Sequence, residues 1–108
     1  MPHTTYIGIG SNLGTPEKNC TDAIKKLATH PDIFLKAQSP FYKTRPVGPI
    51  EQKWFVNAAL KVQTRLSPHD LLGTLLNTEK EMGRVRKEKW GPRLIDLDLL
   101  FYDNLILN

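Results

Sequence analysis

The sequence predicts an α+β fold, in which an antiparallel sheet carries two helices on one of its faces. Four stretches have the length and the apolar pattern of strands, and two have apolar residues at helical spacing. Their order along the chain is β-α-β-β-α-β, which with both helices on the same face gives a ferredoxin-like sandwich. A chain of 108 residues is enough for one core, so residues 1–108 are expected to form a single domain.

The first strand is expected over residues 6–10, a short run of apolar residues and glycine. A turn follows, in which Thr15 and Pro16 have the character of an N-cap and a first helical residue. The helix is expected over residues 17–30 and ends before Pro31. Its apolar residues at helical spacing, which include the single cysteine as a packing residue, are Cys20, Ala23, Ile24, Leu27 and Ala28.

The second and third strands are expected on either side of a loop that is rich in proline and glycine. Residues 33–42 have strand character, with Pro40 as a bulge or edge position. The loop covers residues 43–52 and contains Pro46, Gly48 and Pro49. Residues 54–64 alternate apolar and polar positions with a period of two, which predicts a strand with one buried face.

The second helix is expected from Ser67, a capping residue, to about Met82. Gly83 ends it, and a basic loop leads to a fourth strand over residues 94–102. Residues 105–107 have the character of the start of a fifth strand. The apolar residues that we expect this helix to bury are Leu71, Leu72, Leu75, Leu76 and Met82.

The composition is that of an ordinary globular protein, with 40% hydrophobic and 24% charged residues. No apolar stretch approaches the ~20 residues of a membrane-spanning helix, and the first residues lack the pattern of a secretory signal. A single cysteine is consistent with a reducing compartment. We therefore expect a cytoplasmic protein that has no membrane partner. The net charge of +4 favours an anionic ligand.

Asp96 and Asp98 lie two residues apart in the fourth predicted strand, so their carboxylates leave the same face of the sheet. Two neighbouring carboxylates repel one another unless a cation lies between them, and Mg²⁺ prefers such oxygen ligands together with substrate phosphates. In isolation, the pair is better explained as a solvated edge or as two acids that face nearby arginines. The residues before it favour the metal.

The segment 83–93 is strongly basic, because five of its eleven residues are Arg or Lys. A cationic loop beside a metal-binding strand end suits phosphoryl transfer, where Arg and Lys offset the charge that spreads over phosphate oxygens. A solvated loop, or one that binds nucleic-acid backbone, is the alternative. Trp90 offers a stacking surface for a flat ring, although a lone tryptophan also serves as a packing anchor.

Residues 90–100, with the sequence WGPRLIDLDLL, resemble the signature of the 6-hydroxymethyl-7,8-dihydropterin pyrophosphokinase family, R-x-x-D-x-D before an apolar run. Three further stretches resemble the family in the same order along the chain, namely residues 9–14, 41–49 and 55–59. Together the four stretches extend over nearly the whole chain. The resemblance implies transfer of pyrophosphate from ATP to the hydroxymethyl oxygen of the reduced pterin, with release of AMP, in folate biosynthesis.

The resemblance also implies roles for individual residues on the phosphate side. Asp96 and Asp98 correspond to ligands of two magnesium ions, and Arg84 and Arg93 to arginines that assist the transfer. The residues that correspond to the ATP site are Glu79, Arg86, Lys87, Trp90 and Arg93.

On the pterin side, the corresponding residues are Thr44, Val47, Phe55, Asn57 and Asp96. Elementary chemistry agrees for two of them. The Asn57 amide has both donors and acceptors for a pterin edge, and Phe55, two residues earlier on the same face, can stack on the ring. Without the resemblance, Phe55 is better interpreted as a core residue and Asn57 as an ordinary polar residue of a strand.

The family normally continues beyond the point where this sequence stops, and Arg45 stands where the family often has proline. Three readings follow. The chain is an active enzyme, with a compact site or one completed by a second chain or subunit; or it is a truncated relative that binds nucleotide or pterin without turnover; or its sheet and basic loop bind RNA. The last reading is the weakest, because the sheet lacks a second exposed aromatic residue for base stacking. No nucleic-acid partner is expected.

Overall fold

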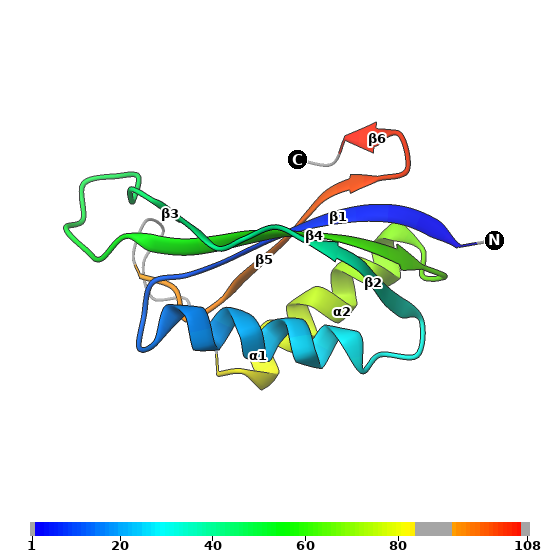
Figure 1. Ribbon diagram of the computed structural model, residues 1–108, viewed down its shortest axis with the longest axis horizontal. Coiled ribbons are helices and arrows are strands. Elements are labelled where there is room, and N and C mark those ends of the chain that lie inside the picture. Colours follow the sequence, from blue (N-terminus) through cyan, green and yellow to red (C-terminus); the bar gives the residue numbers. More distant parts are fainter. Residues whose placement is uncertain (1, 84–91, 107–108) are drawn as a thin grey trace.

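The computed structural model describes residues 2–83 and 92–106 of the chain. Its elements follow the predicted order, except that the stretch predicted as one strand over residues 33–42 contains β2 and the start of a separate short strand, β3 (Figure 1). They are β1 (His3–Ser11), α1 (Pro16–Ala28), β2 (Ile33–Gln38), β3 (Tyr42–Thr44), β4 (Phe55–Thr64), α2 (Pro68–Glu81), β5 (Asp96–Tyr102) and β6 (Leu105–Ile106).

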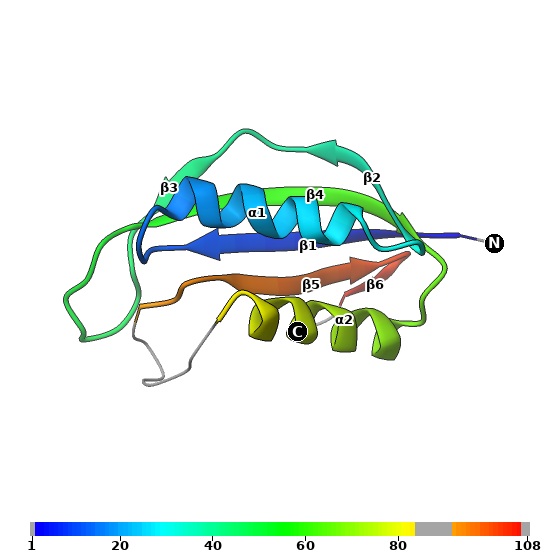
Figure 2. The same ribbon diagram turned by 90° about the horizontal axis from the view of Figure 1, so that it is seen from below.

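The strands form one antiparallel sheet in the order β2-β4-β1-β5-β6, with β3 paired to β4. Because β1 and β2 both pair antiparallel to β4, they run parallel to each other with β4 between them. The same holds for β4 and β5 around β1. Two such split βαβ units make the ferredoxin-like arrangement, and the α+β prediction is confirmed. Both helices cover the same face, α1 over β1 and β4, α2 beside β5 (Figures 1 and 2).

The core lies between this face and the helices. The alternation predicted for residues 54–64 is confirmed, since β4 buries every second side chain from Val56 to Val62. Cys20 is also fully buried in α1, as expected for a packing residue. Burial, with a smaller contribution from the Glu17 carboxylate, raises the pKa of the Cys20 thiol to about 11, so the thiol stays protonated at neutral pH.

The predicted strand 33–42 is wrong as a single element, because β2 ends at Gln38 and β3 begins only at Tyr42. Ser39 still exchanges hydrogen bonds with Ala59, through its backbone amide at 2.9 Å and its hydroxyl at 2.8 Å. Pro40 then has no N–H to continue the ladder. Residues 43 and 44 therefore belong to β3, and the loop starts at Arg45 rather than at Lys43.

The prediction that α2 buries two adjacent leucine pairs is half wrong. Leu71 and Leu75 are fully buried, whereas Leu72 and Leu76 are 45% and 48% exposed. Successive residues of a helix point about 100° apart, so only one member of each pair faces the sheet. The buried stripe continues instead through Thr78 and Glu79. Ala28, which follows buried Leu27 in α1, is exposed for the same reason.

The two helices of the described residues have 13 and 14 residues, and neither combines the length and the hydrophobicity that crossing a membrane requires. The predicted fifth strand is confirmed for residues 105 and 106, which pair with β5. Residue 107 lies outside the described part.

Candidate active site

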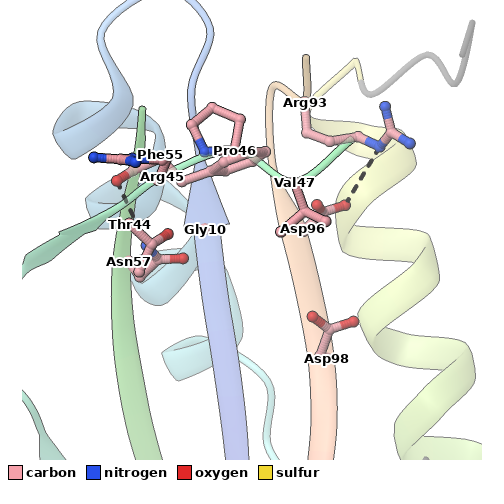
Figure 3. A pocket seen from close by; sticks show the side chains of 10 residues that line it. All are labelled: Gly10, Thr44, Arg45, Pro46, Val47, Phe55, Asn57, Arg93, Asp96 and Asp98. Atoms are coloured by element: carbon pink, nitrogen blue, oxygen red, sulfur yellow. Dashed lines mark hydrogen bonds and ion pairs between the residues drawn. The ribbon is translucent and has the colours of Figure 1, made fainter. Parts of the chain in front are cut away.

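A pocket of about 330 Å³ lies at one end of the sheet, on the face that the helices leave open (Figure 3). The ends of β1, β3, β4 and β5 meet here, together with the start of the loop after β3. The pocket is lined by Gly10, Thr44, Arg45, Pro46, Val47, Phe55, Asn57, Arg93, Asp96 and Asp98.

Asp96 and Asp98 occupy alternate positions of β5 and line the pocket, while Leu97 between them is buried against the core. The prediction that both carboxylates leave the same face of the sheet is confirmed. On the neighbouring strand β1, the residues paired with the two acids are Gly10 and Gly8. Neither paired position of β1 therefore carries a side chain that could cover the carboxylates.

Gly10 also makes room for Asn57 on its other side. A Cβ atom at residue 10 would lie only 2.8 Å from Asn57 Oδ1, closer than a carbon and an oxygen approach without a shift. The Asn57 amide donates a hydrogen bond of 2.7 Å to Thr44 Oγ1, which links β4 to β3. The half-buried ring of Phe55 lines the same wall. The wall thus combines a flat apolar surface with an oriented amide and a hydroxyl.

Arg93 lies on the opposite wall, just before β5, and is only 7% exposed. Its Nε atom lies 4.0 Å from Asp96 Oδ1, so the guanidinium stands beside the acidic pair (Figure 3). The backbone of Arg93 is held to Asn12 by two hydrogen bonds, of 2.8 and 3.0 Å. A buried cation at this place favours binding of anionic groups near the two carboxylates.

The loop between β3 and β4 forms the outer rim of the pocket. Val47, 70% exposed, projects from it at the mouth. Arg45 and Trp54 stand at the two ends of the loop, and the Arg45 guanidinium carbon lies 5.3 Å from the centre of the Trp54 ring. This cation–π contact ties the ends of the loop together.

Seven residues predicted for the site meet in this pocket: Thr44, Val47, Phe55, Asn57, Arg93, Asp96 and Asp98. Glu79 is placed elsewhere. It is 4% exposed on the helix side of the sheet, where its Oε2 accepts a hydrogen bond of 2.7 Å from the Leu97 amide. Arg84, Arg86, Lys87 and Trp90 lie outside the described residues.

Three lining residues were not predicted as site residues. Gly10 had a signal in the sequence, since it lies two residues from Gly8 at the end of a strand. Arg45 and Pro46 lie in the stretch 41–49 that resembles the family, but only Thr44 and Val47 of that stretch were predicted as site residues.

The donor set of the pocket fits a magnesium ion that is shared with a phosphorylated ligand. Among residues 2–83 and 92–106, no three His, Cys, Asp or Glu side chains gather as a complete metal site. Two carboxylates are what the pocket offers, and Mg²⁺ typically takes one or two carboxylates and completes its shell with water and substrate phosphates.

Comparison with known proteins agrees with this chemistry. The family model of 7,8-dihydro-6-hydroxymethylpterin-pyrophosphokinase matches residues 6–108. Three similar proteins are named 2-amino-4-hydroxy-6-hydroxymethyldihydropteridine pyrophosphokinase. The one from Methylorubrum extorquens is 45% identical over 91% of this chain and 62% of its own length, that from Haemophilus influenzae 45% over 96% and 65%, and that from Pseudomonas aeruginosa 40% over 100% and 67%.

The chain thus spans about two thirds of the length of these relatives. The family match covers both walls of the pocket and all but the first five residues. The chain belongs to the 7,8-dihydro-6-hydroxymethylpterin-pyrophosphokinase family.

Proposed function

We propose that the protein transfers pyrophosphate from ATP to 6-hydroxymethyl-7,8-dihydropterin in folate biosynthesis and releases AMP. The observation that carries the proposal is the meeting of two chemically different walls in one pocket. One wall presents Phe55 and Asn57, and the other presents Arg93, Asp96 and Asp98. A reaction between a flat heterocycle and a polyphosphate needs such a pair of surfaces, held at a fixed separation.

The pterin binds along the first wall. Phe55 stacks on the bicyclic ring, and the Asn57 amide pairs with the hydrogen-bonding edge of the pterin. Because Asn57 already donates to Thr44, its amide is oriented before the ligand arrives. Val47, at the mouth, covers the outer part of the ring. This arrangement directs the hydroxymethyl group toward Asp96.

The triphosphate of ATP lies along the second wall. Arg93 stabilises the negative charge that develops on the phosphate oxygens, and its burial strengthens this effect. Asp96 and Asp98 hold two magnesium ions. When bound, the metal supplies charge neutralisation and orientation of the phosphate oxygens. By their place in the family motif, Arg84, Arg86, Lys87 and Trp90 complete the nucleotide side, and Arg84 assists the transfer together with Arg93.

In the reaction, the hydroxymethyl oxygen bonds to the β-phosphorus of ATP while the bond from this phosphorus to the bridging oxygen of the α-phosphate breaks. AMP leaves with that oxygen, and the proton of the hydroxyl group is released. Glu79 acts from behind the site, because its carboxylate holds the Leu97 amide between the two acids. A cytoplasmic location gives the protein access to ATP.

The experiment is an assay of AMP formation from ATP, magnesium and 6-hydroxymethyl-7,8-dihydropterin. We expect the wild-type chain to form AMP, and Asp96→Asn and Asp98→Asn each to lower the rate by at least about 10²-fold, because a metal carboxylate is lost. Wild-type AMP formation no faster than that of the two variants would refute the proposal.

A calorimetric titration with a nonhydrolysable ATP analogue and magnesium separates turnover from binding alone. If the analogue binds and no AMP forms, the chain is a relative that binds nucleotide without turnover. If AMP forms only after a second chain from a longer family member is added, the site is completed in trans.

A further inference from the structure

Asn12 is a buried amide that hydrogen-bonds to Arg93 of one wall and to the end of the loop that leads into the other wall. It directly follows β1 and is 1% exposed. Its Oδ1 accepts a hydrogen bond of 2.8 Å from the Arg93 amide, and its own backbone amide donates one of 3.0 Å to the Arg93 carbonyl. Its Nδ2 donates to Gln52 Oε1 at 2.8 Å and to the Lys53 carbonyl at 2.9 Å.

The orientation of this amide is unambiguous. The Arg93 N–H can only donate and the Lys53 carbonyl can only accept, so oxygen and nitrogen of the Asn12 side chain cannot be exchanged. Both hydrogens of Nδ2 are used. Aspartate has the same shape but lacks both hydrogens, and alanine lacks all three side-chain bonds. Only asparagine among residues of this size joins these partners.

The hydrogen-bond partners of Asn12 lie beside the two walls that we assign to different substrates. Residue 93 carries the buried guanidinium of the phosphate wall and lies three residues before Asp96. Residues 52 and 53 close the loop that forms the rim and lead directly into β4, where Phe55 and Asn57 form the pterin wall. One side chain therefore fixes the backbone of both walls, through segments that are 40 and 81 residues away along the chain.

We propose that Asn12 is a positioning residue, which holds the pterin wall and the phosphate wall at the separation that transfer requires. This inference rests on the proposed function. Asn12 does not line the pocket itself, so it acts through Arg93 and the end of the loop. A positioning residue of this kind affects the rate of reaction between two bound substrates more than the binding of either.

The chain offers a matched control in Asn19. This residue lies on α1, next to the same turn, and its Nδ2 also donates two hydrogen bonds, to Ser11 Oγ at 3.2 Å and to the Leu13 carbonyl at 2.8 Å. Neither bond of this side chain reaches Arg93 or the loop. Asn19→Asp therefore removes a comparable pair of local donors, while the bridge between the walls remains.

The test compares Asn12→Asp, Asn19→Asp and the wild-type chain in AMP formation, with the number of intact sites taken from the stoichiometry of ATP-analogue binding. We expect Asn12→Asp to lower kcat per intact site by about 10²-fold and to change KM for either substrate by less than about threefold. Asn19→Asp should keep the wild-type kcat. An unchanged kcat in Asn12→Asp, or an equal loss in both variants, would overturn the inference.

If Asn12→Asp does not fold, Gln52→Ala replaces it in the test. This variant removes the hydrogen bond between Asn12 and Gln52 at a partly exposed position. A loss of kcat per site with unchanged KM supports the role of the bridge, and a wild-type kcat contradicts it. If the wild-type chain forms no AMP, the proposed function fails instead. The bridge is then judged by calorimetry. In the wild-type chain the ATP analogue should change the pterin affinity, and Asn12→Asp should abolish this change. No change in the wild-type chain, or an equal change in both chains, contradicts the inference.

Discussion

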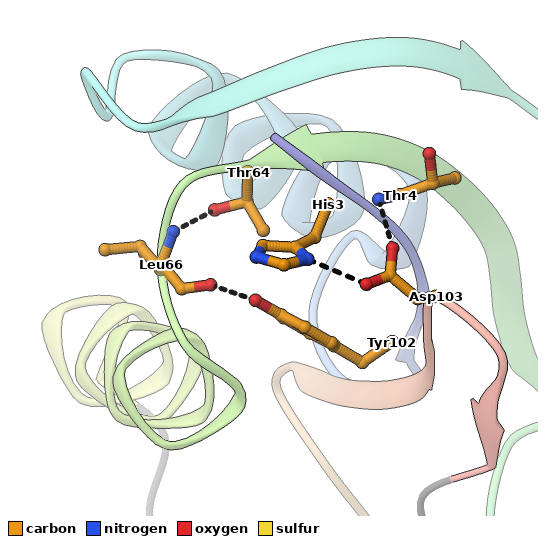
Figure 4. A network of polar contacts seen from close by, with 6 residues as sticks. All are labelled: His3, Thr4, Thr64, Leu66, Tyr102 and Asp103. Atoms are coloured by element: carbon orange, nitrogen blue, oxygen red, sulfur yellow. Dashed lines mark hydrogen bonds and ion pairs between the residues drawn. The ribbon is translucent and has the colours of Figure 1, made fainter. Parts of the chain in front are cut away.

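At one end of the sheet, β1 and β5 contribute glycine and aspartate residues to a pocket. At the other end, His3 of β1 contacts Tyr102 of β5 and Asp103, the residue that follows it. At the second end, Asp103 Oδ2 lies 2.7 Å from His3 Nδ1, and Oδ1 accepts a bond of 3.0 Å from the Thr4 amide (Figure 4). The Asp103 amide donates to the Thr4 carbonyl at 2.7 Å. We call this group of residues, with Leu66, the clasp.

The rings of the clasp add to its hydrogen bonds. The centres of the His3 and Tyr102 rings are 4.9 Å apart, and the Tyr102 hydroxyl donates to the Leu66 carbonyl, which leads into α2 (Figure 4). The clasp thus joins the start of β1, the end of β5 and the segment after β4. Its carboxylate is bound by backbone and side chain within the fold, whereas the two carboxylates at the other end line a pocket. The same pair of strands serves stability at one end and chemistry at the other.

The largest expected effect comes from filling the space that the pocket end keeps open. In Gly10→Ala, the new Cβ would lie 2.8 Å from Asn57 Oδ1, so the Asn57 amide must turn away from its hydrogen bond with Thr44. We expect pterin affinity to fall by about tenfold, which corresponds to the loss of about one oriented hydrogen bond. The measurement is calorimetric titration of 6-hydroxymethylpterin in the presence of magnesium and a nonhydrolysable ATP analogue.

Gly8→Ala is the control for this prediction. The atoms nearest to a Cβ at residue 8 belong to the Leu100 side chain, at 3.4 Å or more, which is an ordinary contact distance. Its pterin affinity should fall by less than that of Gly10→Ala, because the new methyl group does not meet Asn57. If both variants lose affinity equally, or if Gly10→Ala loses none, the space above residue 10 does not serve the pterin.

The two ends also differ in how far the sequence predicts them. The acidic face of β5 was predictable, because a strand with a period of two places Asp96 and Asp98 together and Leu97 opposite. The clasp was not, since it joins residues 100 positions apart and no local pattern marks the pair. The Asn12 bridge was hidden for the same reason. Pairing between distant segments, rather than local preference, determines both.

One wrong prediction and one untested one have another cause. The leucine pairs of α2 show the right period, but which leucine faces the sheet depends on how the helix is rotated against β5, and this rotation is set by packing. Glu79 was predicted from the family resemblance to contact nucleotide, and its position behind β5 is visible only once the Leu97 amide is placed. Its role toward the nucleotide stays a prediction.

An intermediate effect is expected near the clasp, at a buried hydroxyl that the fold leaves unsatisfied. Thr5 pairs with Tyr102, is fully buried, and its Oγ1 has no hydrogen-bond partner among the described residues. Thr5→Val replaces this hydroxyl by a methyl group of similar size. We expect the free energy of unfolding to rise by about 1 kcal/mol, because the cost of burying an unpaired polar group disappears. The measurement is urea denaturation, with an unchanged m-value.

Thr64→Val is the matched control. Thr64 is equally buried, but its Oγ1 donates to the Asp32 carbonyl at 2.7 Å and accepts from the Leu66 amide at 3.1 Å. The same substitution should lower the free energy of unfolding here by about 1–2 kcal/mol. If both variants shift in the same direction, hydrogen-bond satisfaction does not distinguish the two threonines.

The smallest effect is expected at the clasp carboxylate, because both His3 and Asp103 are partly exposed to water and their attraction is screened. The hydrogen bond to His3, followed by that to the Thr4 amide, lowers the pKa of Asp103 below its ordinary value. A folded-state pKa below the unfolded one means that the carboxylate stabilises the fold above the unfolded pKa of about 4, and that this contribution is lost as the pH falls through the lowered value.

Asp103→Asn should therefore melt at a lower temperature than the wild-type chain at pH 7, and the two melting curves should converge below pH 3 to 4. Added salt should reduce the difference at pH 7. AMP formation by Asp103→Asn should stay at the wild-type rate, because the clasp and the pocket lie at opposite ends of the β1–β5 pair, where Tyr102 pairs with Thr5 and Asp96 with Gly10. A melting difference that persists at low pH would show that the loss comes from packing rather than from charge. A fall in AMP formation at a temperature where the variant is folded would show that the two ends are coupled, and would end the division between a stabilising and a reactive end.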